Sequence, residues 1–362
     1  MKILFLGDPD SANTSSWIDG LRQGGCDVVV GSARSDGSAG VFPLGPSWLP
    51  ARLRILFGRK DALALVERFR PDLVIAYRVT SYGYLGARLG FHPLAIAAQN
   101  EQITYMRHPF LPLKLLLERF ARRAVAAADL FHAWGGNLRD GLLRFGADPD
   151  KILVLHRGVD LSVFSADLAA RSYSAASPVF VSTRALAPEY RLDQLIRAFK
   201  LLVGELPGAR LEIIGDGSER GRLEDFAKDL GLADKVSFLG RLPRREVAAR
   251  LAAAEIYISL IETEGVSSSL IEACAAGLTP ILFDMPASRD LVQDGVNGFL
   301  LDDISSPARV AAAMRRCAEA VELRRSAAVL NAKLAQERFD NRRNLAAFVE
   351  RYRQLAGGRH GR

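Results

Sequence analysis

The sequence predicts an α/β protein of two doubly wound domains, each with a parallel sheet covered by helices. Three observations lead to this fold class. Short apolar runs typical of buried strands alternate with amphipathic segments typical of helices. The alternation stops at an Ala- and Ser-rich stretch, 165–177, which precedes Pro178, and then begins again. The 362 residues are enough for two domains that each bury a core.

The first half opens with a strand, a helix and a second strand, which is the usual start of a parallel sheet. Its predicted strands are 2–7, 27–31, 73–76, 94–98, 129–133 and 152–155. Its predicted helices are 15–24, 63–69, 82–90, 113–128 and 137–145. We assign these elements to a first domain over residues 1–165.

The second half repeats the architecture without repeating the sequence. Its predicted strands are 179–182, 210–214, 236–239, 256–261 and 280–283. Its predicted helices are 192–205, 219–230, 244–254, 268–276, 306–319 and 322–337. They form a second domain over 166–340, followed by a basic tail over 341–362. Two such domains facing each other would hold ligands at the carboxyl ends of their strands.

Composition limits the class of protein. No apolar run approaches the roughly 18 residues of a membrane span, and the apolar start is too short for a signal peptide. Three cysteines without metal-ligand spacing favour a reducing cytoplasm and predict no metal site. The net charge of +7 permits nucleic acid, an anionic membrane or a phosphate-rich ligand as partner, but it is equally explained by an arginine-rich genome. We expect no nucleic-acid partner, because the arginines are dispersed and no binding module is recognisable.

The most informative segment is 264–277, which follows a predicted strand and opens a predicted helix. Ser267 or Ser268 can cap that helix, and Gly277 ends it. The free N–H groups of the first turn form an anion site that Gly265 leaves uncovered. The carboxylates of Glu264 and Glu272 flank this site and can each accept two hydrogen bonds from a diol.

This string resembles the Glu-x7-Glu motif of the family-4 retaining glycosyltransferases of GT-B fold, also called glycosyl transferases group 1. The resemblance covers most of residues 70–345 and is stronger in the second half. Its other parts are the strings 157–164 (RGVDLSVF), 211–217 (LEIIGDG), 236–240 (VSFLG), 283–284 (FD) and 294–300 (DGVNGFL). It implies a GT-B fold whose C-terminal helix crosses back to the first domain.

The resemblance implies a role for each matching residue. Glu272 would bind the ribose of a nucleotide-diphosphate sugar, and Glu264 would contact the donor sugar. The amides near Gly265, Val266 and Ser267 would meet the diphosphate, together with Arg184. Leu239, Arg241 and Leu242 would line the base pocket, and Gly215 would belong to a tight turn near the donor pocket. Cations and a helix N-terminus would stabilise the leaving diphosphate without a metal ion, and the donor would be the only cofactor-like ligand.

This sequence lacks two features that the family usually carries at its site. The family's Lys-Gly pair is absent, and Arg191 is the candidate replacement for its cation, although the guanidinium has a different geometry. A His after the fourth strand is also absent. Gln99 and Asn100 are candidates to line the acceptor side there, and Glu101 is a candidate base for the acceptor hydroxyl; a solvated loop is the alternative.

The first loop lacks the family's glycines but carries hydroxyl and amide groups. Asn13 and Thr14 are therefore acceptor-side candidates, with a capped helix start as the alternative. The string 215–217 (GDG) matches part of a dinucleotide fingerprint, but it lies in mid-domain, which favours a tight turn. The strings 8–10 and 148–150 (both DPD) match a metal-binding pattern, but their central proline favours turn chemistry.

The function predicted from the sequence is therefore a glycosyltransferase that moves a hexose to a saccharide, lipid-linked or small-molecule acceptor. A sugar-nucleotide epimerase of the same fold and a nucleotide-sugar sensor remain as alternatives. The segment 107–123 mixes apolar and basic side chains. It is typical either of peripheral docking on an anionic membrane or of a helix packed on the sheet.

Overall fold

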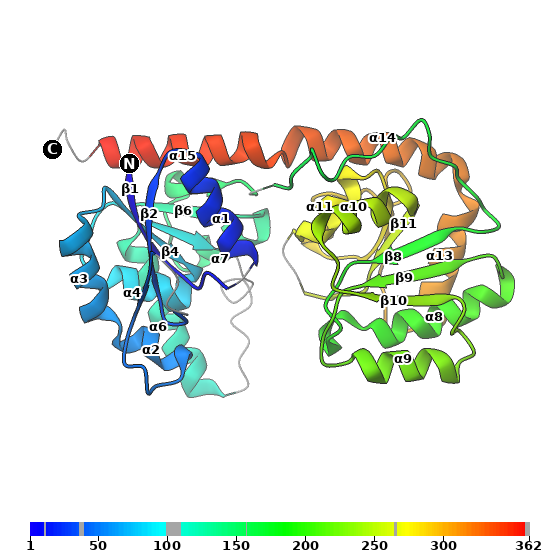
Figure 1. The fold of residues 1–362 in the computed structure, drawn as a ribbon, viewed down its shortest axis with the longest axis horizontal. Coiled ribbons are helices and arrows are strands. Elements are labelled where there is room, and N and C mark those ends of the chain that lie inside the picture. The colour runs from blue at the N-terminus through cyan, green and yellow to red at the C-terminus, as the bar shows by residue number, and fades with distance from the viewer. Residues whose placement is uncertain (11, 36–39, 99–109, 157, 264–265, 359–362) are drawn as a thin grey trace. The chain divides into compact units, whose positions relative to one another are not determined.

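The computed structural model describes residues 1–10, 12–35, 40–98, 110–156, 158–263 and 266–358, without the side chains of residues 12 and 13. The chain divides into two compact units (Figure 1). Unit 1 comprises Met1–Arg157 and Arg342–Arg362, and unit 2 comprises Gly158–Asn341. Each unit is an α/β body with one parallel sheet, which confirms the predicted fold class.

Unit 1 has seven parallel strands within the described residues, in the order β3-β2-β1-β4-β5-β6-β7. The strands are β1 (Lys2–Leu6), β2 (Asp27–Ser32), β3 (Val41–Pro43), β4 (Leu73–Tyr77), β5 (Leu94–Ala98), β6 (Leu130–Ala133) and β7 (Ile152–Val154). The helices are α1 (Ala12–Gln23), α2 (Ala51–Phe57), α3 (Arg59–Phe69), η1 (Arg78–Gly83, a π-helix), α4 (Tyr84–Ala87), α6 (Leu111–Ala127), α7 (Gly136–Arg144), η2 (Pro149–Lys151, a 3-10 helix) and α15 (Asn341–Gly357). Strands β4 and β5 are buried at every residue, because helices cover both faces of the sheet.

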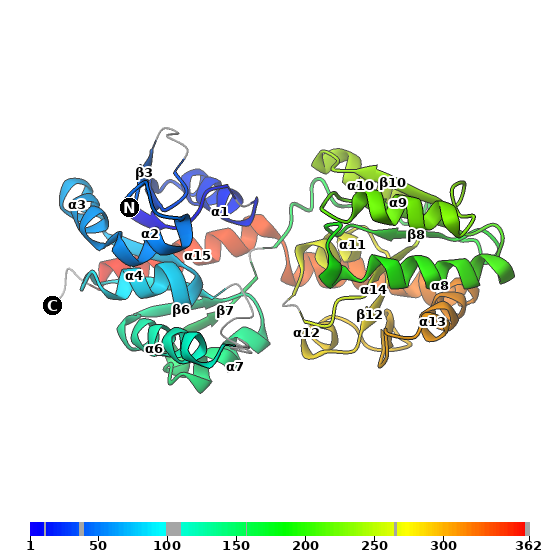
Figure 2. The same ribbon diagram turned by 90° about the horizontal axis from the view of Figure 1, so that it is seen from below.

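Unit 2 has six parallel strands within its described residues, in the order β10-β9-β8-β11-β12-β13. The strands are β8 (Val179–Ser182), β9 (Arg210–Ile214), β10 (Val236–Gly240), β11 (Ile256–Ser259), β12 (Thr279–Phe283) and β13 (Phe299–Leu301). The helices are η3 (Pro188–Tyr190, 3-10), α8 (Leu192–Glu205), α9 (Arg220–Asp229), α10 (Arg244–Ala253), α11 (Ser268–Ala275), α12 (Pro286–Arg289), α13 (Pro307–Glu319) and α14 (Val321–Arg338). Successive strand residues alternate between two core clusters, one on each face of the sheet; Ile256 belongs to one and Tyr257 to the other. Helices lie on both faces of this sheet (Figures 1 and 2).

The elements that the sequence did not predict are short or irregular. They include β3, β13 and α2, whose side chains do not follow a long period. The predicted helix 82–90 is the π-helix η1 followed by the single turn α4. The turn predicted at 148–150 is confirmed, because Asp148 Oδ1 accepts from Asp150 N at 3.0 Å. Among the described helices, none is both long and apolar enough to cross a bilayer.

Unit 2 begins at Gly158, before the Ala- and Ser-rich stretch 165–177 that the sequence predicts as the linker. Val159 N donates to Phe339 O at 2.8 Å, and Asn341 N donates to Val159 O at 3.1 Å. Phe164 is buried in a core cluster of unit 2. These contacts bind 158–164 to unit 2, so the division falls at Gly158.

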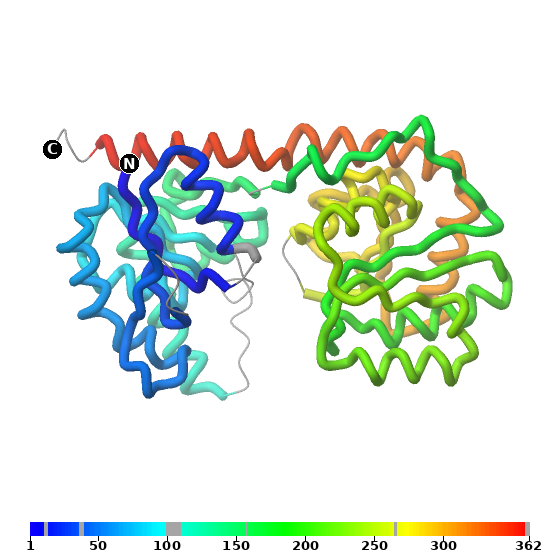
Figure 3. The backbone as a smooth tube through the Cα atoms, in the orientation of Figure 1, coloured from blue at the N-terminus to red at the C-terminus, as the bar shows by residue number. Residues whose placement is uncertain are grey.

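The last helix, α15, belongs to unit 1, and Figure 3 follows the chain as it leaves this unit after β7 and re-enters it at α15. Phe348 of α15 stacks on Trp17, with ring centroids 5.5 Å apart, and its ring centroid lies 3.8 Å from that of His132. Asn344 Nδ2 donates to His156 O at 2.8 Å. The aromatic packing therefore anchors the C-terminal helix to strands of the first sheet.

His132 gives unit 1 a pH-dependent stability. Complete burial lowers its pKa to about 3 from its usual 6.5. The unfolded chain binds a proton below about pH 6.5 that the folded chain excludes, so stability is full above this pH and falls from there toward pH 3. We expect a loss of about 2 kcal/mol between about pH 7.5 and about pH 5.

Tryptophan fluorescence during urea unfolding measures this loss, because Trp17, Trp48 and Trp134 are the only tryptophans of the chain and all lie in unit 1. His132→Gln should flatten the pH dependence, although it lowers the stability at neutral pH. A slope that survives His132→Gln would assign the effect to other groups.

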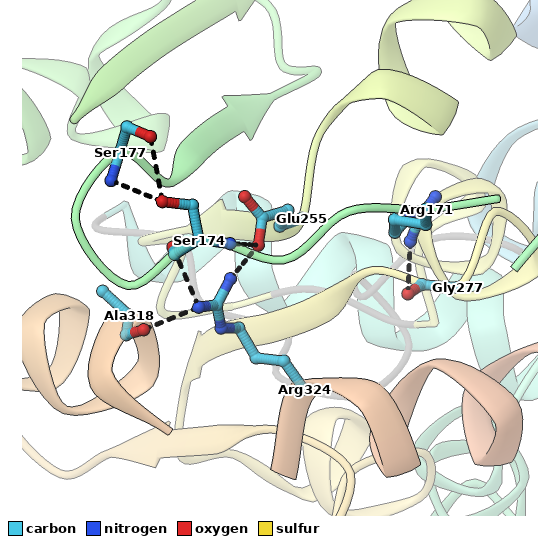
Figure 4. Close-up of polar contacts among 7 residues, drawn as sticks. All are labelled: Arg171, Ser174, Ser177, Glu255, Gly277, Ala318 and Arg324. Atoms are coloured by element: carbon cyan, nitrogen blue, oxygen red, sulfur yellow. Dashed lines mark hydrogen bonds and ion pairs between the residues drawn. The ribbon is translucent and has the colours of Figure 1, made fainter. Parts of the chain in front are cut away.

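A buried ion pair holds the start of unit 2 in place (Figure 4). Arg324 of α14 is fully buried, and it donates to Glu255, to Ser174 O at 3.1 Å and to Ala318 O at 2.6 Å. Ser174 N donates to Glu255 Oε2 at 3.3 Å. Nearby, Arg171 donates to Gly277 O at 2.8 Å. The segment ahead of β8 is thus bound to the residue before β11, to α13 and to α14, chiefly through a buried ion pair.

Candidate active site

The candidate donor residues lie at the point where the strand order of unit 2 reverses. Strand β8 lies between β9 and β11, and the chain proceeds outward from β8 to β9 and β10 on one side and from β11 to β12 on the other. Ligands of open parallel sheets bind outside the carboxyl ends of the strands at such a reversal. Arg184 follows β8, and the segment 262–267 follows β11.

Hydrogen bonds join the loops that leave four strands at this edge. Gly215 N, after β9, donates to Gly240 O at the end of β10 at 2.9 Å. Leu186 N, after β8, donates to Asp216 O at 3.1 Å. Ser269 Oγ, in the first turn of α11, donates to Thr183 O at 3.0 Å. Residues far apart in the sequence are therefore held together as one framework.

Arg184 is part of this framework rather than a free surface cation. Its residue is 6% exposed, and its guanidinium carbon lies 4.5 Å from the centroid of the Tyr190 ring. Its carbonyl oxygen lies against Gly215, where an added Cβ atom would come within 2.0 Å of it. Gly215 also has a φ of 147°, so it is a glycine for reasons of close packing. The string 215–217 is a tight turn that supports the Arg184 loop; its contact with a donor stays a prediction.

Arg191 lies at the junction of η3 and α8, with a φ of 48° in the left-handed region. Glycine favours this conformation, and the sequence lacks the glycine of the family's Lys-Gly pair at this place. The Arg191 guanidinium is 2.8 Å from Glu262 Oε2, just after β11. The pair bridges the two loops at the strand reversal. Glu262 could not be predicted as a site residue, because an isolated acidic residue near an irregular loop belongs to no recognisable sequence motif.

Helix α11 directs its N-terminus to the same edge. Ser267 is its cap, since its Oγ accepts from Leu270 N at 3.1 Å. Val266 and Ser267 are half-buried, as is Glu272 in the second turn. Gly277 ends the helix with a φ of 73°. Glu264 and Gly265 lie outside the described residues.

The predicted base pocket follows β10. The pairing of β10 with β9 shifts between Phe238 and Gly240, so Leu239 is the extra residue of a bulge. Leu239 and Leu242 are half-buried against the core, whereas Arg241 is exposed. The bulge turns Leu239 away from the regular alternation of the strand, which sequence periodicity could not predict.

The acceptor-side candidates are less fully described. Gln99, Asn100 and Glu101 lie outside the described residues, and so does the side chain of Asn13. Thr14 is fully buried in α1 of unit 1. Within the described residues no group of three His, Cys, Asp or Glu side chains is arranged to hold a metal ion.

The framework of unit 2 can stabilise negative charge. A buried guanidinium, a second guanidinium shared with Glu262 and the capped N-terminus of α11 all belong to one sheet edge. Preorganised cations and free backbone N–H groups of this kind stabilise phosphate oxygens without reorganisation. A half-buried carboxylate, Glu272, lies on the same helix.

Comparison with known proteins agrees with this description. The model of Glycosyl transferases group 1 matches residues 170–329, and the model of Glycosyltransferase Family 4 matches residues 15–163. Two solved structures share the fold. One is Anabaena HepE in complex with UDP, with a TM-score of 0.79, 21% identity and coverage of 98% of this chain and 100% of that one. The other is sucrose-phosphate synthase from Thermosynechococcus elongatus, with a TM-score of 0.82, 16% identity and coverage of 99% and 100%.

Curated relatives match parts of the chain. A GDP-mannose-dependent alpha-(1-6)-phosphatidylinositol monomannoside mannosyltransferase from Mycolicibacterium smegmatis is 27% identical over 232 residues, which are 54% of this chain and 61% of that protein. A D-inositol 3-phosphate glycosyltransferase from Mycobacteroides abscessus is 36% identical over 146 residues, which are 38% of this chain and 32% of that protein. The alignments thus span less than two thirds of these relatives.

The two parallel-sheet units place the chain in the class of proteins with the GT-B fold. Within that class the chain belongs to glycosyltransferase family 4, of the glycosyl transferases group 1 type. This confirms the family that the Glu-x7-Glu string and its neighbours indicate.

Proposed function

We propose that the chain is a retaining glycosyltransferase that moves a hexose from a nucleotide-diphosphate sugar to a saccharide, lipid-linked or small-molecule acceptor without a metal ion. The observation that carries this proposal is the framework at the edge of unit 2, where the loop of Arg184 is bonded to the first turn of α11. It would offer a buried cation and the N-terminus of a helix to a leaving diphosphate.

The proposed roles follow from the resemblance to the family. Arg184, Arg191 and the amides near Gly265, Val266 and Ser267 neutralise the diphosphate as the glycosidic bond breaks. Glu272 accepts hydrogen bonds from the ribose, and Glu264 contacts the transferred sugar. Leu239, Arg241 and Leu242 line the base. On the acceptor side the candidates are Asn13, Thr14, Gln99 and Asn100, with Glu101 as the base for the incoming hydroxyl.

Relatives support a nucleotide-sugar donor but do not agree on the base. The mycobacterial mannosyltransferase is named for GDP-mannose, and the Anabaena structure contains UDP. We therefore propose a UDP- or GDP-sugar as donor. The choice depends on the residues beside the base, which include the bulged Leu239.

Calorimetric titration with UDP-, GDP- and ADP-sugars tests the donor assignment. One donor should bind, and Glu272→Ala should weaken it by about 10- to 100-fold, because the ribose loses hydrogen bonds to a charged acceptor. Glu319→Ala, at an exposed glutamate of α13, is the matched control and should not change the affinity. Unchanged binding by the Glu272 variant would contradict the ribose assignment.

Turnover separates the alternatives. Transfer or hydrolysis of the bound donor supports the transferase. Binding without either reaction would indicate a sensor, and conversion of the donor to its epimer without release of nucleoside diphosphate would indicate an epimerase.

We also propose peripheral docking of unit 1 on an anionic membrane. Helix α2 and the start of α6 lie at the same end of this unit (Figure 1). Large apolar side chains on and beside these two segments are exposed, at Trp48, Leu53, Phe57, Phe110, Leu111, Leu115 and Leu116. Basic side chains accompany them, at Arg52, Arg54, Arg59, Lys60, Lys114, Arg119, Arg122 and Arg123. Apolar side chains among excess positive charge favour anionic headgroups.

Vesicle sedimentation tests the docking. Vesicles with about one third phosphatidylglycerol should retain the protein at low salt, and Phe57→Ser with Phe110→Ser should lower the bound fraction severalfold. Val329→Ser with Leu330→Ser, on the exposed face of α14 in unit 2, is the control pair and should bind like the parent chain. Equal binding to uncharged vesicles would contradict the electrostatic part of the proposal.

A further inference from the structure

A carboxylate lies among the cations at the strand reversal of unit 2. Glu262 follows β11, and its Oε2 is 2.8 Å from Nη2 of Arg191. Arg191 belongs to the segment that connects β8 to α8. The pair therefore joins the segments that follow β8 and β11, as the hydrogen bond from Ser269 Oγ to Thr183 O also does. Nothing in the transfer reaction proposed for this site requires that carboxylate.

The backbone holds Arg191 beside the buried cation of the site. Its φ of 48° and ψ of 39° lie in the left-handed region, which residues with a side chain adopt rarely. Its N–H donates to Pro188 O at 3.1 Å, and its carbonyl accepts from Gln194 N at 3.0 Å. The ring of the preceding residue, Tyr190, lies 4.5 Å from the guanidinium carbon of Arg184. Arg191 is thus fixed in the loop that carries Arg184.

Glu262 neutralises the charge of Arg191. Among the residues that the structure describes, it is the only acidic side chain paired with this arginine. The side chains of Arg191 and Glu262 are 33% and 48% exposed, so solvent and a dissolved anion can reach the pair. A guanidinium has five N–H donors in a fork, and the contact with Glu262 engages Nη2. A phosphate that binds the other donors therefore comes close to a second negative charge.

Such a carboxylate affects the donor and the product of a sugar transfer unequally. The diphosphate of a nucleotide sugar carries two negative charges. The released nucleoside diphosphate carries nearly one more, because its terminal phosphate loses a second proton with a pKa of about 6. Repulsion between like charges increases with the charge of the ligand. The product is therefore repelled by Glu262 more strongly than the donor.

We propose that Glu262 is a specificity-determining residue that competes with the ligand for Arg191 and so lowers the affinity of the site for the released nucleoside diphosphate. The inference rests on the proposed function, because it concerns the product of that same transfer. Arg191 attracts the diphosphate of the donor, and Glu262 replaces the diphosphate on Arg191 when the product leaves.

Calorimetric titration with UDP and GDP tests this role in Glu262→Gln, which keeps the size of the side chain and removes its charge. The nucleotide that binds the parent chain should bind the variant about tenfold more tightly, the size expected for one charge removed from a solvated site. The matching nucleotide sugar should gain less. Glu262→Asp keeps the charge, so its affinities should be closer to those of the parent chain than to those of the Gln variant.

Glu205→Gln is the matched control. Glu205 pairs with Arg315 at 3.3 Å in another exposed ion pair of unit 2, at the opposite end of α8 from Arg191, so its loss should not change nucleotide affinity. A purely structural Glu262 predicts the opposite sign, since Arg191 without its anchor would bind both ligands more weakly. Weaker or unchanged binding of the nucleoside diphosphate by Glu262→Gln, or an equal gain for the two ligands, would overturn the proposal.

Inorganic pyrophosphate separates this inference from the proposed function, because it carries the charges of a diphosphate without a base or a sugar. Tighter binding of pyrophosphate and nucleoside diphosphate by Glu262→Gln, in a chain that transfers no sugar, would keep the role of Glu262 and reject the transferase. Sugar transfer by the parent chain, with no gain of product affinity in the variant, would reject this inference alone. A parent chain and a variant that bind neither pyrophosphate nor any nucleotide would reject both.

Discussion

Replacing Arg184 with alanine is expected to lower the turnover of sugar transfer by about 10²- to 10³-fold, the size of effect seen when one preorganised donor to a developing anion is removed. The side chain is buried beside the loop after β8, so its charge is presented in a site with little water. The charge on the diphosphate increases as the glycosidic bond breaks, so the loss should appear more in kcat than in donor affinity.

Two variants control this prediction. Arg184→Lys keeps the charge but not the planar guanidinium over Tyr190, and it should recover part of the activity. Arg315→Ala removes an exposed arginine of α13 and should leave turnover within twofold of the parent chain. A fall that appears only in donor affinity would assign Arg184 to ground-state binding instead of leaving-group stabilisation.

Replacing Arg324 with alanine is expected to destabilise unit 2 by about 3–5 kcal/mol, because it leaves the carboxylate of Glu255 buried without its cation. The change also removes the hydrogen bonds to Ser174 O and Ala318 O that hold the segment before β8 (Figure 4). Arg324→Met keeps the volume but not the charge, and it should be destabilising for the same reason.

The stability of unit 2 can be measured separately from that of unit 1. Every tryptophan lies in unit 1, so fluorescence should report an unchanged transition there. Hydrogen exchange of β8 and β11, followed by mass spectrometry, should report faster opening of unit 2. Arg325→Ala is the matched control, since the neighbouring arginine is exposed and pairs with Glu322 at the surface. Equal exchange in the two variants would show that the buried pair contributes little net stability.

Most of the fold follows from the sequence, because buried parallel strands are short apolar runs and each crossover adds a helix of clear period. The strands β4 and β5 are of this kind. The elements that the sequence did not predict were missed for a physical reason. The π-helix η1 starts at the left-handed Arg78, and nothing in its composition marks that conformation.

The candidate site follows from the sequence only in part. Ser267 as a cap could be predicted, since Ser before an apolar helix is a local signal. The ion pair of Arg191 with Glu262 and the bulge at Leu239 depend on loops that meet only in the folded sheet. Long-range juxtapositions of this kind leave no period in a single sequence.

Proton NMR of the transfer reaction tests the central claim most directly. The donor that binds in the calorimetric screen is incubated with the parent chain, EDTA and a panel of methyl α-glycosides as acceptors. The account predicts a disaccharide whose new linkage keeps the anomeric configuration of the donor, formed at the same rate with and without the chelator, together with free nucleoside diphosphate. An inverted linkage, a reaction abolished by EDTA, or release of nucleoside diphosphate from the Glu272→Ala variant at the parent rate would contradict it.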